Sequence, residues 1–177
     1  MISKERAVEL VEALLAEERL TWAGPVPDLV VYCVEEHAVG WAVFWNSAEY
    51  ARTRDIRDFL VGSGPYLVDL QDGSIHHIPT TTWVAEDWEE LYLQQIRGIR
   101  PRDPLAAPVR ALVHSAGAVA AMRHLRRQAP RLSLQGAKDY VLAVRSGAEP
   151  PEELANLTRE ERRCPPLPIT TLAGPAQ

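Results

Sequence analysis

The stretch GSGPYLVDLQDGSIHHIP, residues 62–79, decides how the rest of the sequence is interpreted, because it places two aspartates and two adjacent histidines beside one turn. Asp72-Gly73 is a strong signal for a two-residue hairpin loop, in which both central residues adopt positive φ. A hairpin closed at this dipeptide puts Asp69 directly opposite His76 on the neighbouring strand. The stretch therefore predicts a hairpin, and it raises the question whether these polar side chains perform chemistry.

The two histidines argue against a metal site in this hairpin. Adjacent residues of a strand point to opposite faces, so His76 and His77 cannot bind one ion together in any register. Asp69 and His76 share a face, where a cross-strand pair of opposite charge contributes about 0.2–1 kcal/mol without any chemistry. A zinc site needs three or four converging ligands, and no ligand spacing connects the hairpin to the other histidines of the chain, His37, His114 and His124.

No catalytic motif accompanies the hairpin. The sequence contains no GxSxG, HExxH or Walker-type loop. We therefore predict a protein that has no catalytic residues, no metal ligands and no cofactor. A metal-assisted hydrolase that uses Asp69, Asp72 and His76 is the alternative from another class.

The composition is that of a globular chain without a strong basic character. The 177 residues carry a formal net charge of -5, and 46% of them are hydrophobic, which is typical of a folded domain. Phosphate recognition usually leaves a basic footprint, so nucleic-acid binding is not expected. No run approaches the roughly 20 apolar residues that span a bilayer, and residues 1–20 have the pattern of an acidic amphipathic helix. We therefore expect a cytoplasmic protein that contacts no membrane.

Hydrophobic periodicity predicts the first elements of the chain. Apolar residues recur at helical spacing over residues 4–19, behind Ser3 as a capping residue. The runs LVVYCV and GWAVFWN, residues 29–34 and 40–46, predict a hairpin. Both faces of the second run are apolar, so this strand is expected to be central or covered on both sides.

Further elements follow towards residue 100. Residues 47–64 predict one or two short helices, and the Asp72-Gly73 hairpin comes next. Residues 80–98 predict a single helix whose apolar stripe consists of Val84, Trp88, Leu91, Tyr92 and Ile96.

These elements predict the α+β class, with an antiparallel sheet of about four strands, in two hairpins, packed against helices. A proline-rich hinge, IRPRDPLAAP, separates this domain, residues 1–100, from a second module. Residues 101–158 predict an all-helical module, and residues 159–177 are expected to form a disordered tail.

The order of motifs in residues 3–98 resembles that of the YrhB-like domain, also called the immunity protein 35 family. The family pattern joins a Gly-Trp strand, a helical segment, a Gly-x-x-Pro-aromatic strand that ends in Asp, a strand with Ile-His, and a closing helix. Here it corresponds to Gly40 and Trp41, to residues 48–60, to Gly62, Pro65, Tyr66 and Asp69, to Gly73, Ile75 and His76, and to residues 88–93. The run RLSLQGAKDYV in the second module is weakly similar to the helical hairpin of the ribosomal stalk protein's carboxy-terminal domain.

The resemblance implies an α+β domain with a non-enzymatic role. Family members are associated with neutralising toxins in bacterial competition, or with chaperone-like activity, so it implies a bacterial protein whose partner is another protein. The acidic start of the 80–98 segment favours a stabilised helix terminus, or a face that meets a basic toxin. The candidate partner-binding residues are Trp83, Glu86, Asp87, Glu89, Glu90 and Asp72.

A third interpretation concerns the basic run MRHLRRQAPR in the second module. It allows a small DNA-binding or transcription-associated protein that acts through Arg126 and Arg127. The helix that would read the bases contains one lysine and an early glycine, which suits base contacts poorly.

Overall fold

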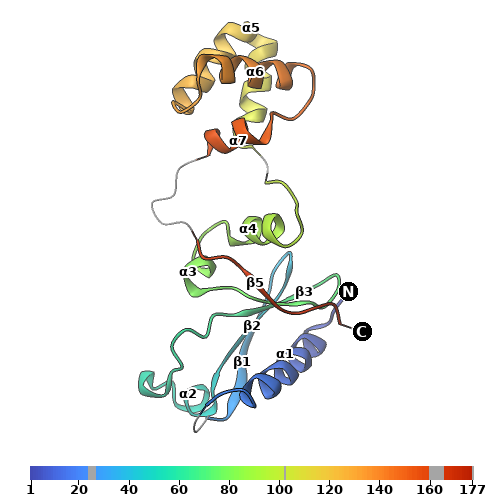
Figure 1. Cartoon of the computed structure of the whole chain (residues 1–177), viewed down its shortest axis with the longest axis vertical. Helices are drawn as coiled ribbons and strands as arrows, with labels where there is room; N and C mark the ends of the chain where they lie inside the picture. The colour runs from blue at the N-terminus through green and yellow to red at the C-terminus, as the bar shows by residue number, and fades with distance from the viewer. Residues whose placement is uncertain (24–26, 102, 160–165, 177) are drawn as a thin grey trace. The chain divides into compact units, whose positions relative to one another are not determined.

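The computed structural model describes residues 1–23, 27–101, 103–159 and 166–176. They form two compact units, Met1–Pro101 together with Pro166–Gln177, and Arg102–Pro165. The first unit is thus made from two segments of the chain, and the second unit is inserted between them in the sequence (Figure 1).

The first unit contains an antiparallel five-stranded sheet with the strands in chain order. This confirms the α+β class, with one strand more than expected. The additional strand comes from the carboxy-terminal segment. The strands are β1 (Leu29–Glu36), β2 (Gly40–Ser47), β3 (Tyr66–Asp69), β4 (Ile75–His77) and β5 (Thr170–Ala173).

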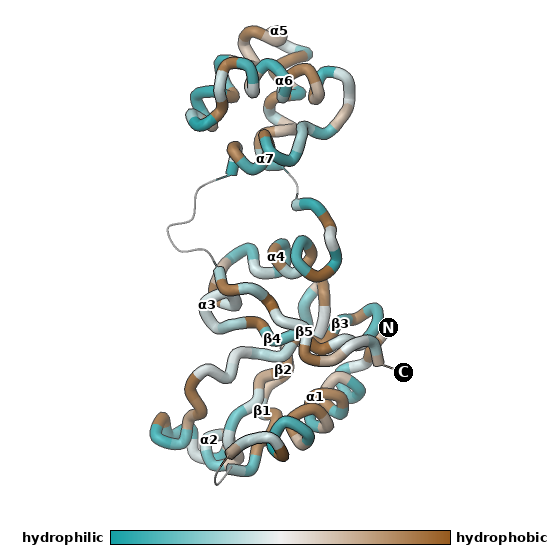
Figure 2. Tube along the Cα trace, in the orientation of Figure 1, coloured by the Kyte–Doolittle hydropathy of each residue, from teal (hydrophilic) through white to brown (hydrophobic). Residues whose placement is uncertain are grey.

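One face of the sheet is covered by α1 (Lys4–Arg19), with the bounds that the periodicity predicts. Ser3 caps the helix by accepting a hydrogen bond from the backbone N–H of Arg6. Hydrophobic and hydrophilic residues alternate along α1 in Figure 2, and Val11 packs into a core with Val43 of the central strand β2. β2 is paired on both edges and packed on both faces, which explains why both of its faces are apolar.

The other face carries two helices where one was expected, α3 (Thr80–Trp83) and α4 (Trp88–Gln95). In a continuous helix, residues five apart point about 140° away from each other. The turn between α3 and α4 instead lets Trp83 and Trp88 contact each other, with ring centroids 4.6 Å apart. The prediction of one apolar stripe was therefore wrong at Val84, which is 72% exposed.

The β3–β4 hairpin has a different loop from the expected one. His76 pairs with Leu67, and Asp69 donates its backbone N–H to the carbonyl of Ser74, so the prediction of Asp69 opposite His76 was wrong by two residues. The Asp69 carboxylate accepts a hydrogen bond from the backbone N–H of Gln71 at 2.7 Å, which begins the loop earlier. Gly73 alone supplies the positive φ, at 72°.

A shift of two residues preserves the face of every side chain. The ring of His76 therefore lies against Tyr92 of α4, whereas the ring of His77 lies against Tyr66. The prediction that the two histidines point to opposite faces is confirmed.

The carboxy-terminal segment was expected to be a disordered tail from residue 159, and this was wrong for residues 166–176. β5 pairs with β4, and the flanking residues form hydrogen bonds with the domain. The backbone N–H of Ile169 donates to Gln95 at 2.9 Å, and that of Ala176 donates to the carbonyl of Asp72 at 2.8 Å. Residues 160–165 of the expected tail lie outside the described ranges.

In residues 103–159 the second unit contains three helices and no strand. Gly117 interrupts α5 with non-helical angles, φ 83° and ψ 168°. Asp103 joins the two ends of the unit, since its carboxylate accepts hydrogen bonds from Tyr140 at 2.7 Å and Thr158 at 3.0 Å. The helices are α5 (Ala106–Gln128), α6 (Leu134–Arg145) and α7 (Glu152–Thr158).

Candidate functional site

A continuous row of aromatic rings crosses the face of the sheet that carries α3 and α4. Each ring contacts the next, with centroid distances from 4.6 to 6.4 Å. We call this row the aromatic strip; its members are Phe59, Tyr50, Tyr32, Phe44, Trp83, Trp88 and His37.

The strip is assembled from side chains of several different elements of the first unit. Tyr50 lies on α2 (Ala48–Thr53), and Phe59 directly follows a short 3-10 helix, Ile56–Asp58. Tyr32 is the extra residue of a β-bulge, because Val31 pairs with Trp45 whereas Cys33 already pairs with Phe44. A bulge redirects side chains, and here it places the ring of Tyr32 beside Phe44 and Tyr50.

Most rings of the strip are only half-buried; Trp88 alone is fully buried, at 7% exposure. Partly exposed aromatic side chains on a rigid domain offer apolar contact area at a low entropic cost. Such residues dominate the binding energy of protein interfaces. The strip is therefore suited to binding another protein.

One end of the strip is acidic. His37 lies edge-on to both Trp83 and Trp88, and its Nδ1 is 3.0 Å from Oε1 of Glu89. Glu35 lies 3.8 Å from the other ring nitrogen of His37. Glu89 also belongs to the first turn of α4, where a carboxylate is stabilised by the helix dipole. The position of Glu89 is thus compatible with both roles proposed from the sequence, stabilising the start of a helix and meeting a basic partner.

The remaining candidate residues do not all gather at this end. Glu86 and Glu90 are exposed on the same α3–α4 segment, and Asp87 is half-buried at the start of α4. Asp72 belongs elsewhere, because its carboxylate accepts hydrogen bonds from the hydroxyl and the backbone N–H of Ser74. We call Glu35, Glu86, Glu89 and Glu90 the acidic end of the strip.

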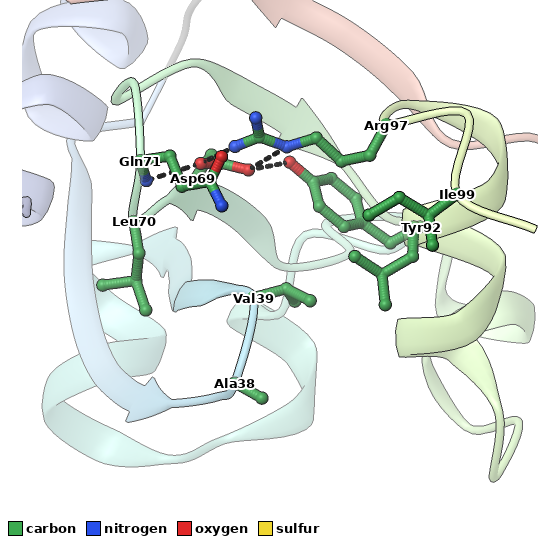
Figure 3. Close-up of a pocket in the computed structure, with 9 residues that line it drawn as sticks. Ala38, Val39, Asp69, Leu70, Gln71, Tyr92, Arg97 and Ile99 are labelled. Carbon is green, nitrogen blue, oxygen red and sulfur yellow. Dashed lines mark hydrogen bonds and ion pairs between the residues drawn. The ribbon is translucent and has the colours of Figure 1, made fainter.

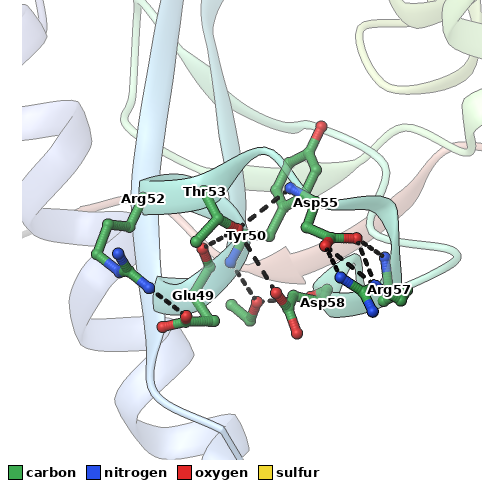
Figure 4. A network of polar contacts seen from close by, with 8 residues as sticks. Glu49, Tyr50, Arg52, Thr53, Asp55, Arg57 and Asp58 are labelled. Carbon is green, nitrogen blue, oxygen red and sulfur yellow. Dashed lines mark hydrogen bonds and ion pairs between the residues drawn. The ribbon is translucent and has the colours of Figure 1, made fainter.

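The opposite end is built by α2 and the 3-10 helix (Figure 4). Exposed ion pairs join Arg52 to Glu49 and Arg57 to Asp55. Ser47 closes the segment, since its hydroxyl donates to the carbonyl of Asp58 at 2.6 Å. The hydrogen bonds of the Ser47 hydroxyl to Asp58 and to the backbone N–H of Tyr50 fix the backbone between Tyr50 and Phe59.

Arg54 ends α2 in the left-handed conformation, with φ 60° and ψ 18°. Its guanidinium lies 4.8 Å from the ring centroid of Tyr32 and 5.7 Å from that of Tyr50. The left-handed conformation costs a non-glycine residue about 1–2 kcal/mol, and an exposed cation–π contact returns about 0.5–1 kcal/mol. The two effects are of similar size, so Arg54 brings the fold little net stability.

A pocket of about 300 Å³ lies beside the β1–β2 loop, lined by Ala38, Val39, Asp69, Leu70, Gln71, Tyr92, Leu93, Arg97 and Ile99. In Figure 3 the side chains of Tyr92 and Arg97 converge on the carboxylate of Asp69. Tyr92 donates its hydroxyl proton to Asp69, and Arg97 forms an ion pair with it. Burial raises the pKa of Asp69, but the hydrogen bonds from Tyr92 and Arg97 outweigh it and hold this pKa below its usual value. A weakly basic carboxylate with its acceptors occupied is suited to structural support.

A partly buried row of hydrogen bonds connects the β3–β4 loop to β5. The Ser74 hydroxyl lies 2.6 Å from Asp72 and 2.8 Å from Nε2 of His76, whose Nδ1 lies 3.1 Å from the hydroxyl of Thr171. Burial lowers the pKa of His76, which favours the neutral ring. Asp72 and His76 are thus engaged in holding the carboxy-terminal strand.

These contacts do not favour the hydrolase alternative. Asp69 and His76 share a face but bind different partners, Arg97 and Tyr92 in one case and Ser74 and Thr171 in the other. Within the described ranges, no group of three or more His, Cys, Asp or Glu side chains is arranged to hold a metal ion.

Sequence reasoning found Trp83 and Glu89 but missed much of the strip. A bulge leaves no pattern in a short apolar run, so nothing in the sequence indicated the position of Tyr32. The segment that contains Tyr50, Arg54 and Phe59 has only short helical pieces. In such a segment, the hydrophobic periodicity does not show on which side of the domain a side chain lies.

The first unit is thus an α+β domain with an antiparallel sheet and a partly exposed aromatic surface that is acidic at one end. Residues 5–91 match the family model described as immunity protein 35. This is the family that the order of motifs suggested, and the match supports it for this part of the chain. No curated protein and no solved structure matches the chain, and the similarity of its later helices to the ribosomal stalk protein has no support. No helix of the described ranges is both long and apolar enough to cross a membrane.

Proposed function

We propose that this protein is an immunity protein that neutralises a toxin protein by covering part of the toxin surface with the aromatic strip. The single observation that carries the proposal is the continuous, partly exposed row of rings on a domain that matches the immunity protein 35 family. Neutralisation by occlusion needs a complementary surface and no turnover. The structural use of Asp69, Asp72 and His76 agrees with this mechanism.

The charge of the first unit indicates the kind of toxin surface that it would meet. This unit contains eight Lys and Arg residues against seventeen Asp and Glu residues, a net charge of -9, whereas the chain as a whole carries -5. Its acidic end lies directly beside the rings. An acidic surface attracts a basic partner and raises the association rate. The proposed partner is therefore a toxin with a basic surface, of the kind that a nuclease uses to hold phosphates.

The rings and the acidic end have separate roles in this proposal. Trp83 supplies apolar contact area, and its loss should raise the dissociation rate. Glu86 and Glu90 are exposed at the margin, where charges mainly affect the association rate and its salt dependence. The cytoplasm, where a toxin of this kind acts, is the proposed location.

Co-expression tests the proposal directly. The chain is produced together with the product of the neighbouring gene, which the proposal expects to be the toxin, and survival of the producing cells is measured. We expect the wild-type chain to restore growth and to bind the purified toxin with a one-to-one or other fixed stoichiometry. A chain that neither restores growth nor binds this product would contradict the proposal. Suppressed aggregation of unrelated proteins would favour the chaperone-like role.

A matched pair of variants tests the position of the surface. Glu86→Lys combined with Glu90→Lys changes the charge of the acidic end, and Glu12→Lys combined with Glu17→Lys makes the same change on α1, across the sheet. We expect the first pair to lower the association rate about tenfold or more at low salt, and the second pair to have a much smaller effect. Equal effects would place the toxin elsewhere.

A further inference from the structure

Arg54 differs from the arginines that surround it. Arg52 and Arg57 each pair with a carboxylate of their own segment, Glu49 and Asp55 (Figure 4). Arg54 is equally exposed, but its contacts among the described residues are the two tyrosine rings, and it forms no ion pair there. Its N–H donors are therefore open to a partner.

The backbone conformation at Arg54 is also unusual. In the described ranges, Arg54 is the one non-glycine residue with a positive φ. Glycine would end α2 in this conformation without the steric cost. An arginine here needs a reason beyond ending the helix, because the cation–π contacts only roughly balance that cost. Unusual backbone conformations of this kind gather at functional positions.

A guanidinium held over aromatic rings is well prepared to bind an anion. It is less strongly hydrated than an ammonium group, and its planar fork matches the two oxygens of a carboxylate. The rings of Tyr32 and Tyr50 already restrict the side chain, so less conformational entropy is lost when a partner binds.

We propose that Arg54 binds an Asp or Glu side chain of the partner protein and thereby fixes the direction in which the partner lies along the aromatic strip. The strip then has two unlike ends, with Arg54 at one and the acidic end, including Glu89, at the other. A partner in the correct direction presents a carboxylate to Arg54 and basic groups to the acidic end. In the reverse direction both ends meet like charges. The inference rests on the proposed function and adds the partner's chemistry at this position.

The test uses the full chain and the toxin that the proposed function expects as the product of the neighbouring gene, with affinity measured by titration calorimetry. Arg54→Gly removes the guanidinium and suits the left-handed conformation, so this variant should fold with a Tm equal to or higher than that of the wild type. We expect its Kd to rise at least tenfold, and that of Arg54→Lys to rise less. Arg52→Ala and Arg57→Ala, the matched controls, should change Kd less than threefold.

A double-mutant cycle separates binding from positioning. Each Asp and Glu on the toxin surface is replaced by Ala and measured against wild type and Arg54→Gly. We expect one acidic position at which the two changes together cost much less than the product of their separate effects. Loss of affinity in Arg54→Gly without such a position would mean that Arg54 only supports the tyrosine rings, and would overturn the inference.

Failure of the proposed function and failure of the inference about Arg54 give different results. A wild-type chain that does not bind the toxin refutes the proposed function and this inference together. A wild-type chain that binds, with an Arg54→Gly variant of unchanged affinity, refutes the inference alone. In that second case the charge reversals at Glu86 and Glu90 still report on the proposed surface.

Discussion

Replacing Arg97 by methionine should destabilise the first unit by about 3 kcal/mol or more. Asp69 is only 1% exposed, and Arg97 gives it both an ion pair and a hydrogen bond from Nε at 3.0 Å. Removing one partner of a buried ion pair costs about 3–5 kcal/mol, because a charge stays buried without compensation. The hydroxyl of Tyr92 and the backbone N–H of Gln71 still bind Asp69, so the lower part of this range applies.

The size of the effect can be checked against two further variants. Tyr92→Phe removes one hydrogen bond to a charged group and should cost about 1.5–3 kcal/mol. Arg52→Met breaks an ion pair whose arginine side chain is 70% exposed, so it should cost about 0–1 kcal/mol. Arg97→Met combined with Asp69→Asn should recover part of the loss, since no charge is then left buried.

Urea unfolding followed by tryptophan fluorescence gives these free energies for the first unit. All five tryptophans lie in Met1–Pro101, so the second unit does not contribute to this signal. A loss below 1 kcal/mol for Arg97→Met, equal to that of Arg52→Met, would show that Asp69 reaches water or takes up a proton at little cost. The account of Asp69 as a buried, compensated charge would then be refuted.

Three further predictions concern the hairpin and the strand that completes the sheet. A chain that ends before Pro166 loses β5 and the preceding residue Ile169, which is 7% exposed; burial of that one side chain is worth about 1.5–3 kcal/mol, and calorimetry should show a lower Tm for the first unit. Burial lowers the pKa of His76, so the unfolded chain takes up a proton at higher pH than the folded one. The free energy of unfolding should therefore fall as the pH drops below about 6.5, and His76→Gln should reduce this slope in titrations from pH 7.5 to 5. A Cβ at Gly64 would lie 2.2 Å from the carbonyl oxygen of Ile78, whereas one at Gly174 meets nothing within 4 Å. Urea unfolding should thus show a loss of about 1–3 kcal/mol for Gly64→Ala and almost none for Gly174→Ala.

Local signals in the sequence were enough for the parts of the fold that depend on neighbouring residues. The cap at Ser3 and the apolar spacing of residues 4–19 define α1 within one segment. The alternation of residues 40–46 identified a strand covered on both faces. His76 and His77 point to opposite faces because they are neighbours on a strand. This prediction was correct although the predicted register was wrong.

The features that the sequence did not reveal depend on contacts between distant segments. The loop of the β3–β4 hairpin is set by the Asp69 carboxylate, which is held by Tyr92 of α4 and by Arg97 just beyond the end of α4. The split of the 80–98 segment allows Trp83 to reach Phe44, 39 positions earlier in the sequence. β5 has too few apolar residues to be recognised alone, and it forms because β4 offers an open edge.

The structure separates the residues that hold the first unit together from those proposed to meet a partner, although both act on α4. Tyr92 fixes this helix to β3 through its hydrogen bond to Asp69, whereas Glu89 and Trp88 contact His37 of the strip. A surface held by such a buried anchor is already in its binding conformation, which lowers the entropic cost of association. A substitution that breaks the contact between Tyr92 and Asp69 should therefore weaken binding only to the extent that it also destabilises the first unit. A change at the half-exposed Trp83 should weaken binding by far more than its effect on folding, and this ratio distinguishes a binding surface from an ordinary piece of core.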